Sequence, residues 1–383
     1  MKICAIICEY NPFHNGHEYL LREAKTRTGA DAVLCIMSGN FVQRGEATIL
    51  EKHIRAKHAV ECGADIVIEL PTVFATSNAE LFARGAISIL SKIPSITHLC
   101  FGAETADKET FERTARALTT EPETVSEEIK TQMKAGVSYA TALTEARKKH
   151  LPTTLFTMPN NILGLEYTKA LLSIGSKIEI LPIQRVGANY LDACVHTEYS
   201  SATAIRTAAF DGRIYDVEKQ TPKQVFDDLL LSSKIDLSLA EKLAILNVSP
   251  EVLATTLDCT EGLENAFKNA ATSTRTLEES LVSTRYTASR IRRIALQNLL
   301  NIRKDFIFEC LSNPLYIHPL AYKGERTDLL SALSKASIPF LASGKEKRNL
   351  TRTAKACLSQ DEYAEQVYSV LAGREFENKT VII

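Results

Sequence analysis

The sequence predicts an α/β fold in which a doubly wound, parallel, Rossmann-like sheet is followed by a mainly α-helical second half. Up to Arg206, short apolar runs alternate with helix-length segments, the runs are apolar on both faces, and no confident strand follows until about residue 315. Runs of this kind are typical of parallel strands buried between two layers of helices. Ligands of such sheets bind beyond the C-terminal ends of the strands, so the loops there hold the candidate site.

The expected elements follow in chain order. Strands are expected over Ile3–Cys8, Ala32–Met37, Ile66–Leu70, His98–Phe101 and Ile178–Ile183, and the helices between them over Glu18–Thr28, Lys52–Glu61 and Ala79–Leu90. The second half predicts helices over Pro222–Leu231, Leu239–Leu246, Leu263–Ala271, Leu277–Leu281, Tyr286–Ile302 and Leu329–Ala336, with a weak strand at Leu315–His318. The polar segment Asp211–Gln220 is the expected connector, which divides the chain into domains 1–210 and 211–383.

Composition excludes several protein classes. With 45% hydrophobic and 24% charged residues, the 383-residue chain is neither disordered nor fibrous. It holds no uncharged apolar run of about 18 residues, which predicts no membrane span. Nine cysteines without a C-x-x-C pair predict neither a disulfide framework nor a structural zinc, and favour a cytoplasmic location. The net charge of −1 argues neither for nor against a polyanionic partner. That question has to be decided from the local distribution of charge.

The loop after the first strand carries the first motif. Asn11-Pro12 ends the strand, and Gly16 allows a close approach to the next helix. His14 and His17 are expected to share the first turn of that helix, where free N–H groups and the helix dipole favour an anion. Two imidazoles there are expected to hold nucleotide phosphates and stabilise charge on the α-phosphate. The alternative, capping and packing, is disfavoured by their position.

A Ser/Thr-rich segment ending in Arg206 follows the last expected strand. The hydroxyls of Ser201 and Thr203 can cap a helix and bind phosphate, and Arg206 can contact the β- and γ-phosphates with two N–H groups. A structural capping box would explain the serines but not the arginine one turn later.

Together, H-x-G-H and this segment resemble the two signatures of the HxGH nucleotidylyltransferase superfamily, which attacks the α-phosphate of ATP or CTP and releases pyrophosphate. The strings EYNPFHNGH (9–17), SGNFVQRGEATIL (38–50), ELP (69–71), PNNILGLEY (159–167) and SSATAIR (200–206) resemble more narrowly the bacterial tRNA(Met) cytidine acetate ligase family. The resemblance implies that ATP activates acetate to acetyl-adenylate. The N4 amine of the wobble cytidine of elongator tRNA(Met) then attacks, giving N4-acetylcytidine and AMP.

The resemblance also implies a residue-level site. His14, His17 and Arg206 would be catalytic, and the ATP site would comprise Ile7, Glu9, Tyr10, Asn11, Pro12, Phe13, His14, Gly16, His17, Leu20, Gly102, Asn160 and Arg185, with Ser201 and Thr203. Physically, Gly102 could admit a base or ribose, Asn160 read its edge and Arg185 pair with phosphate. The alternatives are a tight turn for Gly102, an Asx-turn for Asn160 and a surface ion pair for Arg185. Mg²⁺ usually bridges phosphates in such reactions, although the sequence contains no pair of Asp residues that indicates a dedicated Mg²⁺ site.

The loop after the second strand is the candidate pocket for acetate or the flipped cytidine. Two glycines make the loop flexible, and Asn40, Gln43, Arg44 and Glu46 give it polar groups. The residues assigned to the pocket are Ser38, Gly39, Asn40 and Gln43, and Phe41 offers a stacking face. An ordinary solvent-exposed loop is the alternative interpretation.

Two basic clusters predict a tRNA footprint in the second half. No acidic residue interrupts Ser280 to Lys304, which holds Arg285, Arg290, Arg292 and Arg293 among others. The second cluster holds Lys345, Lys347 and Arg348, followed by Arg352 and Lys355. Paired clusters of this kind suggest contacts to a phosphate backbone, whereas either cluster alone could be a solvated face.

Two other functions stay open at this point. A small-molecule nucleotidylyltransferase or carboxylate-adenylating ligase would not need the long, locally basic second half. A non-enzymatic RNA-binding protein would have no need of His14, His17 and Arg206 together. Neither the general base for the N4 amine nor the oligomeric state follows from the sequence.

Overall fold

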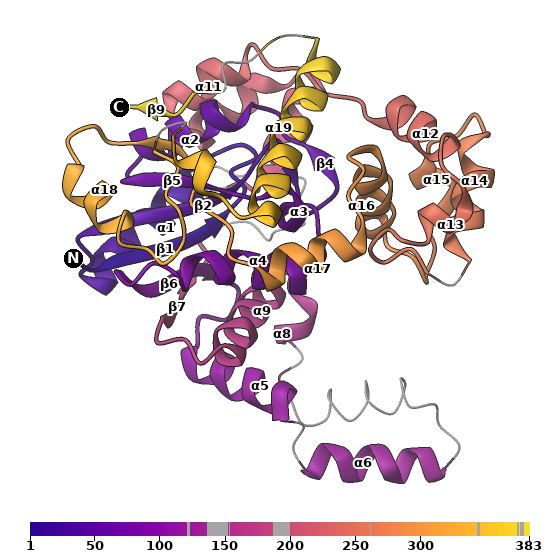
Figure 1. Ribbon diagram of the computed structural model, residues 1–383, viewed down its shortest axis with the longest axis horizontal. Helices are drawn as coiled ribbons and strands as arrows, with labels where there is room; N and C mark the ends of the chain where they lie inside the picture. Colours follow the sequence, from indigo (N-terminus) through magenta and orange to yellow (C-terminus); the bar gives the residue numbers. More distant parts are fainter. Residues whose placement is uncertain are drawn as a thin grey trace.

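A seven-stranded sheet forms the centre of the described part of the protein, in the order β7-β6-β1-β2-β5-β8-β9 (Figure 1). This computed structural model describes residues 1–120, 123–135, 152, 154–186, 200–260, 262–342, 345–373, 375 and 379–383. The strands of the sheet are β1 (Ile3–Cys8), β2 (Ala32–Ser38), β5 (Ile66–Leu70), β6 (Ile96–Ala103), β7 (Glu179–Gln184), β8 (Pro319–Tyr322) and β9 (Val381–Ile382).

The first five of these strands run parallel and are covered on both faces. β1 pairs with β2 from Ile3 and Ala32 onward, and with β6 on its other side. Its alternate side chains enter two different apolar cores, because successive residues of a strand point to opposite faces. Helices α4 (Ala79–Leu90) and α9 (Pro159–Ser173) complete one core, and α1 (Asn15–Thr28) and α2 (Lys52–Glu61) complete the other. The predicted doubly wound, mostly parallel fold is confirmed.

The second half of the chain contributes more to the sheet than the sequence predicted. β8 pairs antiparallel with β5, and β9 pairs parallel with β8. The strand expected at Leu315–His318 is therefore found directly after that segment, at Pro319–Tyr322. Strands from beyond residue 210 thus lie within the sheet. The long helix α19 (Arg352–Ala372), which the sequence analysis did not predict, packs against α3 (Thr72–Ala75). The domain boundary near residue 210 stays a prediction about independently folding units.

A helical part lies to one side of the sheet, beyond α16 (Figure 1). Helices α12 (Ser238–Leu246), α14 (Leu263–Ala271), α15 (Leu277–Leu281) and α16 (Ala288–Leu299) share a third apolar core. α16 also contacts β4 (Glu46–Ala47), which pairs with β3 (Phe41–Val42). The helical part therefore reaches the loop that follows β2.

The remaining described elements connect these layers. They are α5 (Lys108–Thr120), α6 (Glu123–Lys134), α8 (Thr154–Thr157), α10 (Ala202–Phe210), η1 (Ile214–Gln220), α11 (Lys223–Leu229), α13 (Pro250–Leu253), α17 (Lys304–Ser312), α18 (Thr327–Leu333) and η2 (Glu346–Asn349). Within the described ranges, none of the helices combines the length and the hydropathy that crossing a membrane requires.

Candidate active site

A cleft opens where β1, β6 and β7 end, at the edge of the sheet that the strand order predicts for a ligand. The predicted residues that line it are Ile7, Glu9, Tyr10, Asn11, His14, Gly16, His17, Leu20, Gln43, Gly102, Asn160, Arg185, Thr203 and Arg206. The structure therefore brings together segments up to about 200 positions apart in the sequence. Arg44 and Glu46, which belong to the loop after the second strand but were not assigned a role, line the same cleft.

His14 and His17 form the N-terminal cap of α1. The Nδ1 atom of His14 accepts a hydrogen bond from the Gly16 N–H at 3.1 Å, and the Nδ1 atom of His17 accepts one from the His14 N–H at 3.3 Å. A neutral ring whose Nδ1 accepts carries its proton on Nε2. Both rings therefore keep an Nε2–H donor while they cap the helix, so the capping and phosphate-binding interpretations are compatible.

Burial keeps both imidazoles neutral in the unliganded cleft. It lowers the pKa of His14 to about 3, with a smaller contribution from the charge of Arg185. Burial also lowers the pKa of His17 well below its usual value, aided by His14 and Arg185. The cause is that a low-dielectric environment disfavours the charged form. The N-terminus of α1 therefore presents two neutral imidazole N–H donors, with Arg185 as a nearby cation.

The loop before α1 is fixed by packing and by a backbone hydrogen bond, and two of its residues, Pro12 and Phe13, do not line the cleft. Pro12 and Phe13 are buried, and the Phe13 ring packs edge to face against Tyr10 with centroids 4.9 Å apart. Asn11 Oδ1 accepts a hydrogen bond from the Ile49 N–H at 2.9 Å. These contacts fix the shape of the loop; direct binding of ATP by Pro12 and Phe13 stays a prediction.

Arg206 reaches the first loop from the opposite side of the cleft. Ser201 caps α10, accepting from the Ala204 N–H at 3.0 Å, and is itself buried. One turn later, Arg206 Nη1 donates to the Asn11 carbonyl at 2.7 Å, and Nη2 lies 3.4 Å from Glu46 Oε2. Glu46 also forms an ion pair with Arg292 of α16. One carboxylate therefore links the arginine of the second motif to the helical part.

The far wall of the cleft is organised by Glu104. Its side chain accepts hydrogen bonds from Asn160 Nδ2 at 2.6 Å and from the Asn161 N–H at 3.0 Å. Asn161 Oδ1 in turn accepts from the Glu104 and Thr105 N–H groups. Neither Glu104 nor Asn161 was predicted, although the Pro-Asn-Asn string could have drawn attention to the second amide. Gly102 leaves room beside Arg185, whose Cγ would lie 3.4 Å from a Cβ at position 102.

The loop after β2 lies mostly beneath the cleft. Ser38, Gly39 and Asn40 are buried and do not line the cleft, whereas Gln43 does. The ring of Phe41 is buried and packs against Tyr368. The prediction that Phe41 offers a stacking face to a base is therefore wrong. The acetate or cytidine pocket assigned to Ser38, Gly39, Asn40 and Gln43 stays a prediction.

A fully buried arginine, not predicted from the sequence, ties this loop to the first one. Arg55 donates to the carbonyls of Leu50 at 2.9 Å and Ser38 at 3.1 Å, and also to those of Glu9 and Gly39. Backbone carbonyls thus satisfy its guanidinium group, which lies below the cleft floor.

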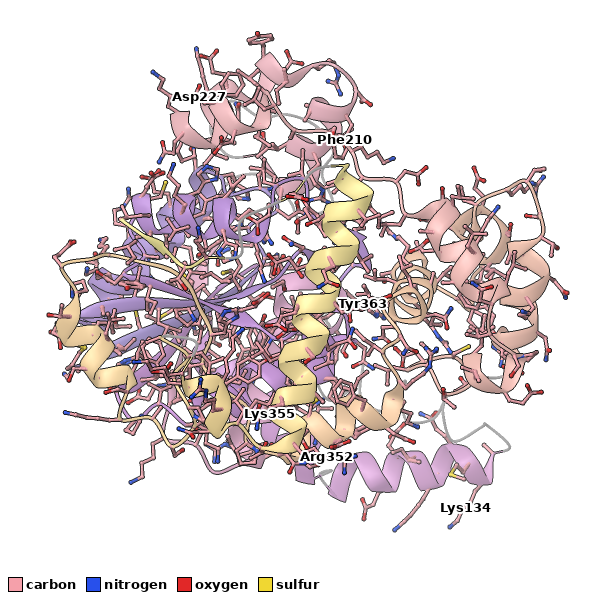
Figure 2. All side chains as sticks on the ribbon, turned by 45° about the horizontal axis from the view of Figure 1, so that its top comes forward. Lys134, Phe210, Asp227, Arg352, Lys355 and Tyr363 are labelled. Atoms are coloured by element: carbon pink, nitrogen blue, oxygen red, sulfur yellow. The ribbon has the colours of Figure 1, made fainter. Side chains whose placement is uncertain are left out.

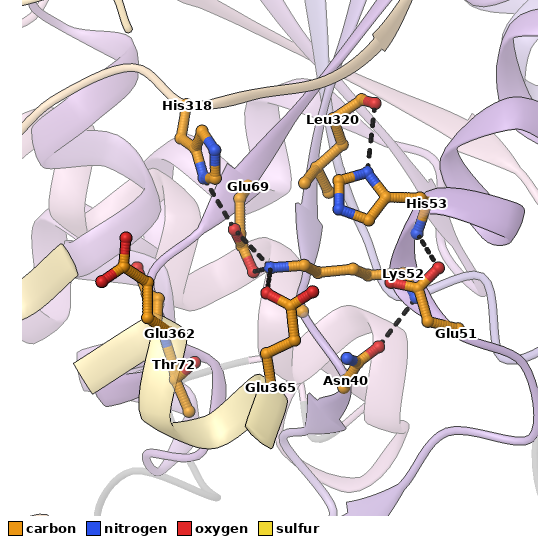
Figure 3. A network of polar contacts seen from close by, with 12 residues as sticks. Asn40, Glu51, Lys52, His53, Glu69, Thr72, His318, Leu320, Glu362 and Glu365 are labelled. Carbon is orange, nitrogen blue, oxygen red and sulfur yellow. Dashed lines mark hydrogen bonds and ion pairs between the residues drawn. The ribbon is translucent and has the colours of Figure 1, made fainter. Parts of the chain in front are cut away.

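The one group of potential metal ligands within the described ranges lies outside the cleft lining. Ligand atoms of Glu51, His53 and Glu365, all buried, lie within 4.8 Å of one another. One member of this group already has a cationic partner, because Lys52 Nζ lies 3.2 Å from Glu365 Oε2 and also 3.0 Å from Glu69 Oε1 (Figure 3). His318 Nδ1 lies 2.9 Å from Glu69 in the same network. This network joins α2, β5, β8 and α19 and is interpreted as structural.

The arginines of α16 face inward more than the charge pattern suggested. The Arg293 side chain is 12% exposed and lies 3.8 Å from Asp258 Oδ2, and its Nη1 donates to the Gln43 carbonyl at 3.4 Å. Arg290 donates to the Asp258 carbonyl at 2.7 Å, and Arg292 pairs with Glu46. Of the four arginines predicted to bind tRNA in this run, only Arg285 is exposed.

All the basic residues of the second cluster are exposed. Lys345, Lys347 and Arg348 lie on or beside η2, and Figure 2 shows Arg352 and Lys355 in the first turns of α19. Lys347 Nζ lies 2.8 Å from Glu362 Oε1. Contact of either cluster with tRNA stays a prediction.

Comparisons with known proteins agree with this geometry. A family model described as HIGH Nucleotidyl Transferase matches residues 1–381. A tRNA(Met) cytidine acetate ligase of Acetivibrio thermocellus is 37% identical over 368 residues, covering 89% of this chain and 88% of that protein. One from Clostridium perfringens is 35% identical over 355 residues, covering 88% of each.

Solved structures agree over the full length. Apo Thermotoga maritima TmcAL (form I) has a TM-score of 0.90 at 30% identity, covering 100% of both chains. Thermotoga maritima TmcAL bound with alpha-thio ATP (form II) has a TM-score of 0.88 at 29% identity, covering 100% of this chain and 99% of that one.

Proposed function

The chain belongs to the HIGH nucleotidyl transferase family and, within it, to the tRNA(Met) cytidine acetate ligases, and we propose that it is an ATP-dependent ligase acting on the wobble cytidine of elongator tRNA(Met). It forms acetyl-adenylate from acetate and ATP, and transfers the acetyl group to N4 of the cytidine. The observation that carries the proposal is the pair of neutral imidazoles on the α1 N-terminus, which line one cleft with Arg206.

In the first step, an acetate oxygen attacks the α-phosphorus of ATP. The bond between that phosphorus and the oxygen bridging to the β-phosphate breaks, and pyrophosphate leaves. The Nε2–H groups of His14 and His17 and the N-terminus of α1 stabilise the charge that grows on the α-phosphate oxygens. Arg206 and Arg185 bind the departing phosphates, so the proposed catalytic residues are His14, His17 and Arg206.

In the second step, the N4 amine attacks the acetyl carbonyl. A C–N bond forms, the C–O bond to the adenylate breaks, and AMP leaves. The cleft supports this order because the lining segments that would hold ATP and the loop around Gln43 border the same space. Acetate therefore needs no separate cavity.

Mg²⁺, when bound with ATP, would supply neutralisation of the phosphate charge. The two carboxylates in the described cleft lining do not form a cage for it. Glu46 is engaged by Arg206 and Arg292, and Glu9 accepts hydrogen bonds from Gln43 and Ser38.

The tRNA would lie along the helical part, with its wobble base entering the cleft. α16 supports this path because its backbone packs on the cleft loop at Gly45. The cations Arg285, Lys345, Lys347 and Arg348 are exposed to solvent, where a phosphate backbone can reach them. A tRNA substrate would place the reaction in the cytoplasm.

One assay tests the proposal against its alternatives. The protein is incubated with ATP, ¹⁴C-acetate and total tRNA, and label on tRNA and release of pyrophosphate are both measured. Label on tRNA(Met), lost when ATP is omitted, is the expected result. Acetate-dependent pyrophosphate release without labelled tRNA would favour a small-molecule adenylating enzyme. Tight tRNA binding without either product would favour a non-enzymatic RNA-binding protein.

A further inference from the structure

The second step needs a group that removes a proton from the attacking amine. The N4 amine of cytidine is a weak nucleophile, and the nitrogen becomes acidic as the C–N bond forms. A general base within hydrogen-bond reach therefore accelerates such transfers, by about 10²- to 10⁴-fold in typical cases. The cleft lining offers few groups that could accept this proton.

The histidines are excluded by their own hydrogen bonds. Each ring uses the Nδ1 lone pair to accept a backbone N–H of the α1 cap, and its neutral form carries the proton on Nε2. Neither imidazole can take up a proton without breaking the cap. Tyr10 is also excluded. Its buried hydroxyl is hydrogen-bonded with Cys35 Sγ at 3.3 Å, and burial holds the pKa of the phenol well above its usual value.

Two carboxylates line the described part of the cleft, and they differ in their partners. Glu46 has one oxygen on Arg206 and the other on Arg292. Both oxygens of Glu46 are therefore engaged by guanidinium groups, which leaves neither placed to accept a proton from the amine. Glu9 holds its carboxylate differently: Oε1 accepts the Gln43 N–H at 2.8 Å and the Ser38 hydroxyl at 3.5 Å. Among the residues described, nothing donates to Glu9 Oε2.

The backbone of Glu9 is also fixed. Its carbonyl accepts a hydrogen bond from the buried Arg55, which holds the Ser38 and Gly39 carbonyls as well. The carboxylate therefore stands on a rigid support, with one oxygen oriented by two donors. This is the arrangement expected of a preorganised base.

We propose that Glu9 is the general base of the acyl-transfer step. Its Oε2 takes a proton from N4 as the amine attacks the acetyl carbonyl, the C–O bond to the adenylate breaks, and AMP leaves with that electron pair. The proton then passes from Glu9 to solvent. This inference rests on the proposed function, because it concerns the second of its two steps.

The electrostatic surroundings of Glu9 are consistent with that role. Burial raises the pKa of Glu9 above its usual value, while the Gln43 N–H and the charges of Arg44, Arg206 and Arg55 oppose the rise. A carboxylate whose pKa is raised is a stronger base, when ionised, than an exposed carboxylate.

The test separates the two steps in the full-length protein. Acetate-dependent exchange of labelled pyrophosphate into ATP reports the first step. Single-turnover transfer from preformed, enzyme-bound acetyl-adenylate to tRNA(Met) reports the second. In Glu9→Gln we expect transfer to slow by about 10²- to 10⁴-fold and exchange to slow by less than about tenfold. Glu9→Asp, which keeps the carboxylate, should recover part of the transfer rate.

A pH profile and a matched variant guard against a purely structural effect. The transfer rate of the wild-type protein should fall as pH is lowered through the Glu9 pKa, and this limb should vanish in Glu9→Gln. In Glu46→Gln, which alters the other cleft carboxylate, both steps should slow together because Arg206 loses its ion pair with Glu46. Wild-type transfer by Glu9→Gln, or equal slowing of its two steps, would overturn the inference. If the wild-type protein itself does not acetylate tRNA, the proposed function fails, and the inference fails with it.

Discussion

His14 and His17 stack their imidazole rings at the start of α1, with centroids 3.7 Å apart and planes inclined by 26°. The Gly16 between them has no room for a side chain, since a Cβ there would lie 2.9 Å from His14 Cε1. The ring stacking, the two capping hydrogen bonds and the absence of a Cβ at Gly16 together position two Nε2–H donors on one helix turn. The H-x-G-H spacing therefore has a geometric reason in this protein.

Removing either imidazole should abolish adenylate formation while preserving the fold. We expect His14→Ala and His17→Ala to lower acetate-dependent pyrophosphate exchange by about 10²- to 10³-fold, because each loses a donor to the α-phosphate. Stability should fall by only about 1 kcal/mol through removal of the cap. Exchange assays and urea unfolding measure the two effects. His98→Ala, outside the cleft lining, is the control, and full exchange activity in a cleft variant would remove that histidine from the mechanism.

Stability should fall as the solution becomes acidic, in part because of His14. Its folded pKa of about 3 lies below the usual histidine value of 6.5. Between those values the unfolded chain binds the proton and the folded protein does not, so stability rises with pH in that window. From pH 7 to pH 5 this residue should account for a loss of about 2 kcal/mol. Urea unfolding of the wild type and His14→Gln at both pH values measures it. An identical pH dependence in the two proteins would show that His14 is not buried in its neutral form.

The contact between the cleft loop and α16 depends on Gly45. This residue has φ +73°, and a Cβ there would lie 2.5 Å from the Arg293 nitrogen and 2.6 Å from the Arg292 carbonyl carbon. Gly45→Ala should therefore cost at least about 2 kcal/mol and displace Glu46 from Arg206. Gly29→Ala is the matched control, because Gly29 has φ +57° but open space around it. It should cost about 1 kcal/mol. Equal losses of unfolding free energy in the two variants would contradict the close packing.

Exposed cations, and not those turned inward, should bind the tRNA backbone. Charge reversal at Arg285 and Arg348 should weaken tRNA(Met) binding and reduce the slope of log K against log salt by about one for each phosphate that is no longer neutralised. Affinity for ATP should not change. Reversal at Arg293, which the basic run also suggests, should instead damage the cleft loop, because its guanidinium contacts Gln43 and Asp258. Lys134→Glu, an exposed change on α6, is the control (Figure 2). Undiminished tRNA affinity in the Arg285 and Arg348 variant would reject this surface.

Much of the site was predictable because its signals are local. Five apolar runs predicted the parallel strands, and their order fixed the edge at which ligands bind. The H-x-G-H motif and the Ser201 to Arg206 segment each lie at the start of one helix, so their spacing in the sequence directly predicts their spacing at the site. Both were found lining the same cleft.

Other elements were missed because their local signals are weak. β8 is four residues long and begins with a proline, and β9 has two residues. Helix α19 buries Asp361 and Glu365 among its core-facing residues, which interrupts the apolar stripe that identifies an amphipathic helix. These polar residues are buried because Thr72, Tyr316 and Lys52 provide partners from other elements.

The sequence by itself determined the five parallel strands, the histidine pair at the start of α1 and the family to which the chain belongs, because each depends on residues that are neighbours along the chain. Only the tertiary structure decided which charges can serve function. Glu46 meets Arg206 across 160 positions and Arg292 across 246, and these pairings leave Glu9 as the cleft carboxylate with an oxygen that receives no donor among the described residues. Coulombic and hydrogen-bonding partners are set by distance in space, and a sequence records only distance along the chain.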